Sequence, residues 1–139
     1  MKPDELAATH AAAFADTRAW SAAEFADLLS DPKCFVTGSA ASFVLMRVIA
    51  DEAEVLTLAT APADRRKGFA RTALQAAEAE ATKRGALAVF LEVAEDNTAA
   101  RALYESLSYR QVGRRAGYYT PKNGAPVAAL VLRKEIAAK

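Results

Sequence analysis

The sequence contains very few of the residues on which disulfide, metal and histidine chemistry depend. Its 139 residues include one cysteine, Cys34, and one histidine, His10. A single cysteine excludes an intramolecular disulfide, and one cysteine with one histidine cannot form a Cys/His metal cage, so we expect no metal. A catalytic triad with a histidine base would have to use His10, which stands among alanines and is more simply a helix-face residue.

Long apolar runs and a large net charge are also absent. The longest apolar runs, such as 86–91 and 127–132, are too short to cross a bilayer, and no charged-then-apolar signal segment opens the sequence. With 53% hydrophobic residues, 25% charged residues and a net charge of +1, the composition is typical of one ordinary globular domain. We therefore expect a single domain over residues 1–139, in the cytoplasm and without a membrane partner.

The small net charge conceals an uneven distribution. Residues 1–60 carry four Lys or Arg against nine Asp or Glu, a net −5, and residues 61–139 carry fourteen against eight, a net +6. This asymmetry suits a cationic substrate on one side and a phosphate-bearing ligand on the other, although scattered surface charge gives the same count. Nucleic-acid binding fits less well, because the cations gather at a helix start rather than along a groove-filling face.

The spacing of apolar residues predicts helices and strands in one mixed α/β fold. Two helical stripes come first, with Ser21 as the N-cap of the second helix and Asp31-Pro32 after its end. Strands are then expected at 34–37, 42–49 and 54–59, with turns at 38–39 and 51–52. A helix follows with the stripe Phe69, Ala73, Leu74, Ala77 and Ala81, and after it a central strand at 86–93 that is covered on both faces. A helix from Asn97 to 107 and strands at 109–119 and 127–133 complete the order. This order predicts a mixed sheet of about six strands flanked by about four helices.

Cations concentrate where one of these helices begins, in the segment RRKGFAR at 65–71. The positive end of the helix macrodipole disfavours cations, whereas the free N–H groups there favour an anion. Gly68 would allow a ligand to approach the main chain closely, so a diphosphate explains the pattern. The segment matches neither the P-loop nor the Rossmann motif. The alternative is that Arg65, Arg66 and Lys67 are solvated loop charges.

Three segments, in order, resemble one family. Residues 58–62 and 65–70 resemble the acyl-CoA-binding segment of the GNAT acyltransferase superfamily, with its Q/R-x-x-G-x-G/A pattern. Residues 97–109 resemble that family's N-x-x-A-x-x-L-Y-x-x-x-G-F, and residues 113–119 match the G-x-R-x-x-Y-Y of RimI-type protein N-terminal acetyltransferases. Trp20-Ser21 also resembles a Trp-Ser of that group, and the resemblance covers about residues 5–135.

This resemblance implies a GNAT fold, acetyl-CoA (coenzyme A) as the acyl donor and a set of binding residues. The cofactor-binding residues that it implies are Leu58, Ala59, Thr60, Arg65, Arg66, Lys67, Gly68, Phe69, Ala70, Arg71, Asn97 and Tyr104. Those implied to bind the acceptor peptide are Trp20, Arg115, Tyr118 and Tyr119. From the residues alone, Asn97 is also the N-cap of its own helix, and the two tyrosines are also a strand pair.

Forming an amide from a thioester requires a neutral amine and a proton for the departing thiolate. Glu92 is the one ionisable residue in its strand, and a carboxyl buried there is a stronger base than one in water. The resemblance implies Glu92 as general base and Tyr104 as general acid, on either side of one cleft. Alternatively, Glu92 faces water and Tyr104 packs its ring. An α-amine, with a pKa near 8, is deprotonated more easily than a lysine near 10.4, which favours N-terminal substrates.

The sequence departs from the family pattern in three places. No counterpart of the family's first strand precedes Pro3, Ser108-Tyr109 replaces Gly-Phe, and residues 125–130 lack an acidic residue common in RimI-type enzymes. The first departure predicts a missing or shortened strand, and the second is tolerable if the turn needs no positive φ. We expect a monomer or weak dimer that acetylates a protein N-terminus, with a ribosomal protein as the acceptor. The alternatives are acetylation of a small amine or lysine, and a non-catalytic CoA-binding or partner-binding domain.

Overall fold

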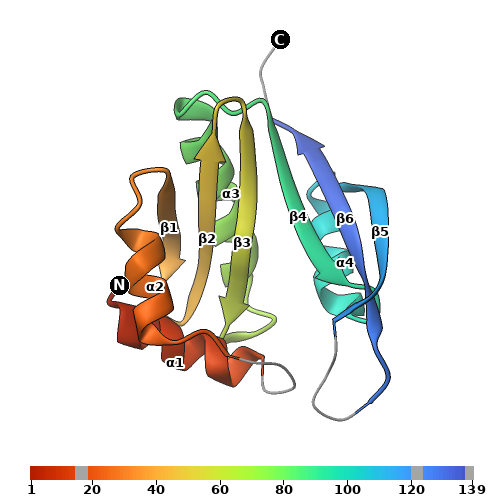
Figure 1. Cartoon of the computed structure of the whole chain (residues 1–139), viewed down its shortest axis with the longest axis horizontal. Coiled ribbons are helices and arrows are strands. Elements are labelled where there is room, and N and C mark those ends of the chain that lie inside the picture. The colour runs from red at the N-terminus through yellow and green to blue at the C-terminus, as the bar shows by residue number, and fades with distance from the viewer. Residues whose placement is uncertain (15–18, 120–123, 137–139) are drawn as a thin grey trace.

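The structure is a computed structural model that describes residues 1–14, 19–119 and 124–136. In these residues the helices and strands follow the order that the sequence predicts (Figure 1). They are α1 (Pro3–Ala13), α2 (Ala22–Leu29), β1 (Cys34–Ser39), β2 (Ser42–Ile49), β3 (Glu52–Thr60), a 3₁₀ turn η1 (Pro62–Asp64), α3 (Phe69–Lys83), β4 (Ala88–Ala94), α4 (Thr98–Ser106), β5 (Arg110–Tyr119) and β6 (Val127–Glu135). No strand precedes α1 among the described residues, as the sequence predicts.

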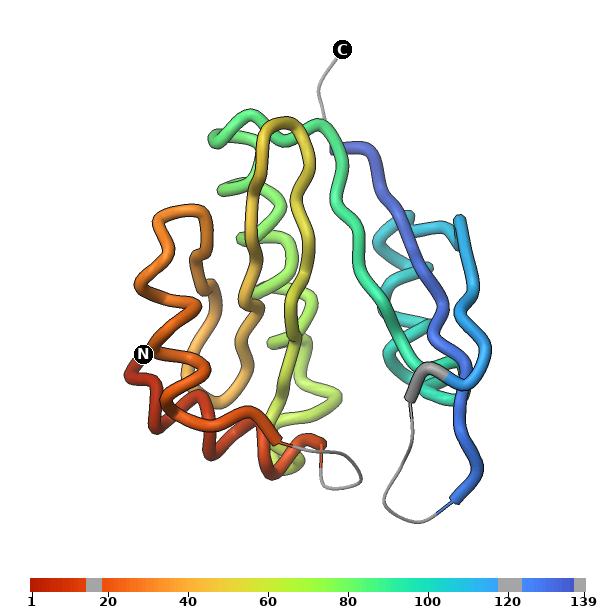
Figure 2. The backbone as a smooth tube through the Cα atoms, viewed as in Figure 1, coloured from red at the N-terminus to blue at the C-terminus, as the bar shows by residue number. Residues whose placement is uncertain are grey.

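The strands form one mixed sheet in the order β1-β2-β3-β4-β6-β5. Neighbouring strands are antiparallel except β3 and β4, which are parallel and pair only from Glu52↔Ala88 to Glu54↔Phe90. Beyond these pairs, β3 continues beside β2 alone and β4 beside β6 alone. The two strands therefore diverge toward their carboxyl ends, as Figures 1 and 2 show. This divergence, called the β3–β4 split below, opens the middle of the sheet.

Helices cover the two faces of the sheet unequally. One buried cluster joins β2 and β4 to α3 and α4, and a second joins the other face of β2 to Leu6 of α1 and Phe25 of α2. Figure 1 shows α3 and α4 behind the sheet and α1 and α2 in front of its β1–β2–β3 side. The prediction that the strand at 86–93 is covered on both faces is therefore wrong: Phe90, Glu92 and Ala94 are only partly buried, and β2 is the strand buried on both sides.

Gly38 does not form a turn, contrary to the sequence prediction. It lies inside β1 opposite Phe43, and the turn falls at Ala40-Ala41. Its φ is +97°, and a Cβ there would lie 2.3 Å from the Ser42 carbonyl oxygen and 2.9 Å from the Ala73 Cβ. A glycine is required because the backbone and α3 approach too closely for a side chain.

His10 lies in a buried aromatic cluster between α1 and α2. Its ring stacks on Trp20 at 5.1 Å and lies 4.7 Å from Phe14 and 5.8 Å from Phe25, measured between centroids. The Trp20 backbone N–H donates to His10 Nδ1 at 3.2 Å. Ser21 begins α2 with the capping box that the sequence predicts, because its side chain accepts from the Glu24 N–H and the Glu24 side chain from the Ser21 N–H.

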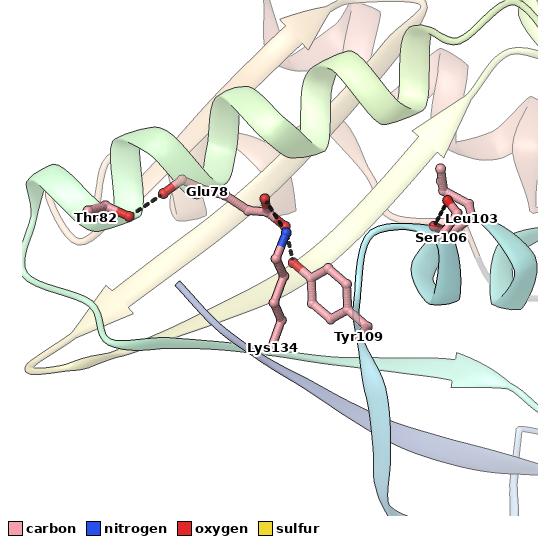
Figure 3. A network of polar contacts seen from close by, with 6 residues as sticks. All are labelled: Glu78, Thr82, Leu103, Ser106, Tyr109 and Lys134. Atoms are coloured by element: carbon pink, nitrogen blue, oxygen red, sulfur yellow. Dashed lines mark hydrogen bonds and ion pairs between the residues drawn. The ribbon is translucent and has the colours of Figure 1, made fainter. Parts of the chain in front are cut away.

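A buried polar network joins α3 to the other half of the sheet (Figure 3). The Glu78 carboxylate of α3 accepts a hydrogen bond from the Tyr109 hydroxyl at 2.8 Å and an ion-paired hydrogen bond from Lys134 Nζ of β6 at 2.9 Å. Tyr109 follows Ser108, whose φ is +74°. The turn therefore needs a positive φ at Ser108, so replacing Gly-Phe by Ser-Tyr has a conformational cost.

Candidate active site

The β3–β4 split leaves backbone groups of β3 without a strand partner. The Ala61 N–H donates to the Ala41 carbonyl at 2.7 Å, continuing the β2–β3 ladder. Because alternate residues of an antiparallel strand direct their N–H and C=O groups to the same side, Leu58 and Thr60 direct theirs away from β2, into the split. Leu56 is an extra residue in this ladder, since Thr57 pairs with Leu45 and Val55 with Met46. Such a bulge re-aims the strand where the pairing ends.

The start of α3 lies at the same open end of the sheet, directly after β3 and η1. The helix begins at Phe69, so the cations Arg65, Arg66 and Lys67 precede it, and Gly68 is an N-cap in the left-handed conformation without a side-chain cap. The first main-chain bond of the helix is from the Thr72 N–H to the Gly68 carbonyl. The N–H groups of residues 68–71 therefore have no acceptor in the described part of the chain, which is the arrangement that binds anions.

The side chains of this segment do not all point toward an incoming anion. Arg65 Nη2 donates to the Ala13 carbonyl of α1 at 3.1 Å, Lys67 lies 3.7 Å from Asp64, and Arg71 Nη2 donates to Ser106 Oγ of α4 at 2.6 Å. Arg66, at a φ of +64°, makes no hydrogen bond or ion pair with any described residue. Of these four cations, Arg66 alone therefore has a guanidinium not engaged by the described chain.

Phe69 does not belong to the apolar stripe of α3, contrary to the sequence prediction. Its side chain is 48% exposed, whereas Ala73, Leu74, Ala77 and Ala81 are buried against the sheet. Phe69 is the first residue of the helix, so it lies beside the uncapped N–H groups rather than over the core. The exposed ring remains accessible to a ligand held there.

Glu92 and Tyr104 lie on opposite faces of β4. Leu91 and Val93 pack in the same buried cluster as Tyr104 of α4, so Glu92, between them, projects from the other face. Tyr104 is 6% exposed, and its ring lies edge-on to Tyr109 with centroids 5.9 Å apart. The expectation of a single cleft bounded by both side chains is therefore wrong, because the alternation of β4 separates them.

The two carboxylate oxygens of Glu92 have different surroundings. Oε1 lies 3.5 Å from Nη1 of Arg115 on β5. Oε2 is buried and has no hydrogen-bond partner in the described structure. The Glu92–Arg115 contact was not predicted, because the two residues are far apart in the sequence and β6 lies between their strands. No short-range pattern signals such a contact.

Other residues that the resemblance implies for the site lie at the start of α4, ahead of α2 and at the end of β5. Asn97 is the N-cap of α4, with its Oδ1 accepting from the Ala100 N–H at 3.2 Å, so that interpretation is confirmed and its side-chain NH₂ group is left for other use. Trp20 is half-buried and stacks on His10, which fixes its ring between α1 and α2. Tyr118 and Tyr119 form the end of β5, where Tyr119 pairs with Val127, but their side chains lie outside the described structure.

Comparisons with known proteins identify the family to which this split mixed sheet belongs. The family model described as "Acetyltransferase (GNAT) family" matches residues 4–109. The chain therefore belongs to the GNAT acetyltransferase family, and its fold is the GNAT fold.

Similar proteins include one curated relative and two solved structures. The [Ribosomal protein bS18]-alanine N-acetyltransferase of Escherichia coli K12 is 36% identical over 94 residues, which cover 68% of this chain and 64% of that protein. The crystal structure of the E. coli ribosomal-protein-S18-alanine N-acetyltransferase has a TM-score of 0.87 at 29% identity, covering 99% of this chain and 89% of that one. Arabidopsis thaliana NAA60 with acetyl-CoA has a TM-score of 0.80 at 16% identity, covering 98% and 96%, and shows the fold alone. The match to the curated relative thus spans slightly less than two thirds of that protein's length.

No helix in the described ranges is both long enough and apolar enough to pass through a bilayer.

Proposed function

We propose that this chain is an acetyl-CoA-dependent N-acetyltransferase whose acceptor is a protein N-terminal α-amine. Membership of the GNAT family supports the acetyl transfer, and the E. coli relative acts on an alanine of a ribosomal protein, as its name states. The observation that carries the proposal is that the open N–H groups of Leu58 and Thr60 and the uncapped start of α3 occur at the same end of the β3–β4 split. This combination matches a ligand that has an anionic end and an extended, carbonyl-bearing arm.

The residues present fit coenzyme A. The free N–H groups of residues 68–71, together with Arg66, would hold its diphosphate, because both main-chain donors and a guanidinium favour an anion. The outward groups of Leu58 and Thr60 would pair with the amides of an extended arm, in the manner of an added strand, and would polarise a carbonyl oxygen. The side-chain NH₂ group of Asn97 would add a donor near the start of α4. Bound acetyl-CoA supplies the activated acetyl group as a thioester.

The two faces of β4 support separate proton-transfer roles for Glu92 and Tyr104. Glu92 Oε2 is a buried acceptor without a partner among the described residues, so it is the atom that would take a proton from the acceptor ammonium. Tyr104 lies on the α3–α4 side, where its buried phenol would hold the proton that a departing thiolate needs. We therefore propose that the acceptor approaches from the Glu92 face, past Trp20, Arg115, Tyr118 and Tyr119. The thiol would leave toward the opposite face.

The acceptor class can be tested directly. The chain is incubated with acetyl-CoA and peptides that have a free alanyl N-terminus, and thiol release and the mass gain of one acetyl group are followed. Matched controls are the same peptides blocked at the N-terminus with an internal lysine, and a free polyamine. We expect acetylation of the free N-terminus, because an α-amine is more easily deprotonated than a lysine. Transfer to the lysine or polyamine instead would contradict the N-terminal assignment, and CoA binding without any transfer would indicate a non-catalytic domain.

A ribosomal-protein acceptor would be met in the cytoplasm, the compartment that the sequence predicts, by a monomer or weak dimer. Sedimentation of the chain alone and with CoA would measure its assembly state.

A further inference from the structure

Arg115 reaches Glu92 across an intervening strand. Glu92 pairs with Val131 of β6, and Arg115 pairs with Ala129 of the same strand, two residues away. Residues two apart lie on the same face of a strand, so Glu92 and Arg115 project from the same side of the sheet. Their side chains meet with Nη1 3.5 Å from Oε1. A cation from β5 therefore lies beside the proposed base.

The two oxygens of the Glu92 carboxylate differ in their contacts. Oε1 faces the guanidinium, whereas Oε2 is buried without a partner among the described residues. An unpartnered buried carboxylate oxygen is costly, and such atoms are rare in folded proteins unless a ligand or water completes them. Arg115 is well suited to fix Glu92 Oε1 in place, because its guanidinium is always charged, planar and rigid.

We propose that Arg115 positions Glu92 by holding Oε1, so that Oε2 remains directed at the acceptor amine as the atom that receives its proton. The inference rests on the proposed function, in which Glu92 is the base. It makes Arg115 a positioning residue that acts through Glu92, rather than one that only lines the peptide groove. Removing the guanidinium would let the carboxylate rotate away from the productive orientation.

The neighbouring residue Arg114 provides a matched control. It also pairs with a glutamate, Glu95, through two hydrogen bonds of 2.9 and 3.1 Å, and it is exposed to a similar degree, 50% against 57% for Arg115. Because it is adjacent in β5, Arg114 projects from the opposite face. Exposed ion pairs contribute little to stability. Any general effect of losing such a pair would therefore be small and similar in the Arg114 and Arg115 variants. An effect on the acceptor side would appear only in Arg115 variants.

The test is a double-mutant cycle in N-terminal peptide acetylation. Arg115→Gln is expected to lower kcat by about tenfold to a hundredfold while leaving KM for acetyl-CoA unchanged. Arg115→Lys is expected to recover part of the loss because it restores the charge, and Arg114→Gln to retain the full rate. In the Glu92→Gln background, Arg115→Gln is expected to cause no further loss, since the oxygen it would position is no longer a base. Thermal unfolding and calorimetric CoA binding of each variant verify that the fold and the cofactor site persist.

Several results would overturn the inference. They are a kcat for Arg115→Gln within about twofold of the unaltered chain, an equal loss in Arg114→Gln, or an undiminished loss in the Glu92→Gln background. A higher acceptor KM with unchanged kcat would also overturn it, because Arg115 would then bind the peptide without acting on Glu92. If the unaltered chain acetylates no N-terminal peptide, the proposed function itself fails and the role of Arg115 fails with it. An active chain with an indifferent Arg115 contradicts only this inference.

Discussion

The Tyr109 hydroxyl donates a 2.8 Å hydrogen bond to the Glu78 carboxylate, which Lys134 also holds at 2.9 Å. Glu78 belongs to α3, behind the β1–β2–β3 side of the sheet, whereas Lys134 belongs to β6 on the other side of the split. Lys134 pairs with Val89, and Val89 with Ala53, so this network reinforces the junction of the two parts of the sheet at the end where β3 and β4 still pair. Tyr109 also contacts the ring of Tyr104, which connects the network to the proposed acid.

Stability should depend on the ionisation of Tyr109 at high pH. Burial, and then the Glu78 carboxylate, raise the pKa of the Tyr109 phenol above its ordinary 10.0. The folded chain therefore holds this proton more tightly than the unfolded chain, so its contribution is complete below pH 10 and declines as pH rises above that value. The expected decline is about 1.4 kcal/mol per pH unit. Urea unfolding between pH 9 and 11 should show a steeper loss in the unaltered chain than in Tyr109→Phe, and equal slopes would refute the coupling.

Ser108→Gly should stabilise the fold. Ser108 adopts a φ of +74°, which a glycine occupies without the clash that an L side chain meets. We expect a gain of about 1 kcal/mol in the free energy of unfolding, measured with urea. Ser108→Ala is the control, because it keeps a Cβ and should gain nothing. A similar change in both variants would show that the turn is not strained.

Gly38→Ala should destabilise the fold much more than Gly85→Ala. Both glycines have similar positive φ values, +97° and +95°, but a Cβ at Gly38 would clash with the Ser42 carbonyl while a Cβ at Gly85 meets nothing within 4 Å. We expect a loss of about 1 kcal/mol for Gly85→Ala and of more than about 2 kcal/mol for Gly38→Ala. Equal losses by urea unfolding would show that β1 can shift away from the Ser42 carbonyl and from α3 at little cost.

Arg66→Ala should weaken the binding of coenzyme A. Arg66 is the guanidinium of this segment that the described chain does not engage, so it is available to the diphosphate. We expect the dissociation constant from calorimetry to rise about tenfold, and the difference to shrink at high salt. Lys33→Ala, an exposed cation ahead of β1, is the control and should bind CoA normally. An unchanged Kd for Arg66→Ala would leave the main-chain groups of residues 68–71 as the proposed diphosphate site.

The sequence predicts those features that short-range patterns encode. Ser21 and Asn97 are identified as helix caps, because each signal lies within a few residues of the boundary that it marks. The order of helices and strands is also predicted, since it requires only the local period of the apolar residues.

The sequence does not predict features that depend on how strands face their neighbours. Glu92 and Tyr104 lie on different faces because of the alternation of β4 against α4, which no motif states. The Glu92–Arg115 contact requires knowledge that β6 lies between their strands. Phe69 fits a helical stripe by spacing, but its place in the first turn leaves it 48% exposed. Gly38 resembles a turn residue, but its positive φ and its close approach to the Ser42 carbonyl and to Ala73 of α3 are what require a glycine.

Because only three residue pairs join β3 to β4, the sheet consists of two parts connected by a short parallel ladder, and each part has its own helix behind it. Amide protons of Leu58 and Thr60 should exchange rapidly with solvent, while those of Ala59 and Ala61, bonded to β2, exchange slowly. A pantetheine arm bound between these two parts would pair with β3 as an added strand and would slow the exchange of the Leu58 and Thr60 amides. Cofactor capture and the completion of the sheet would then be a single event.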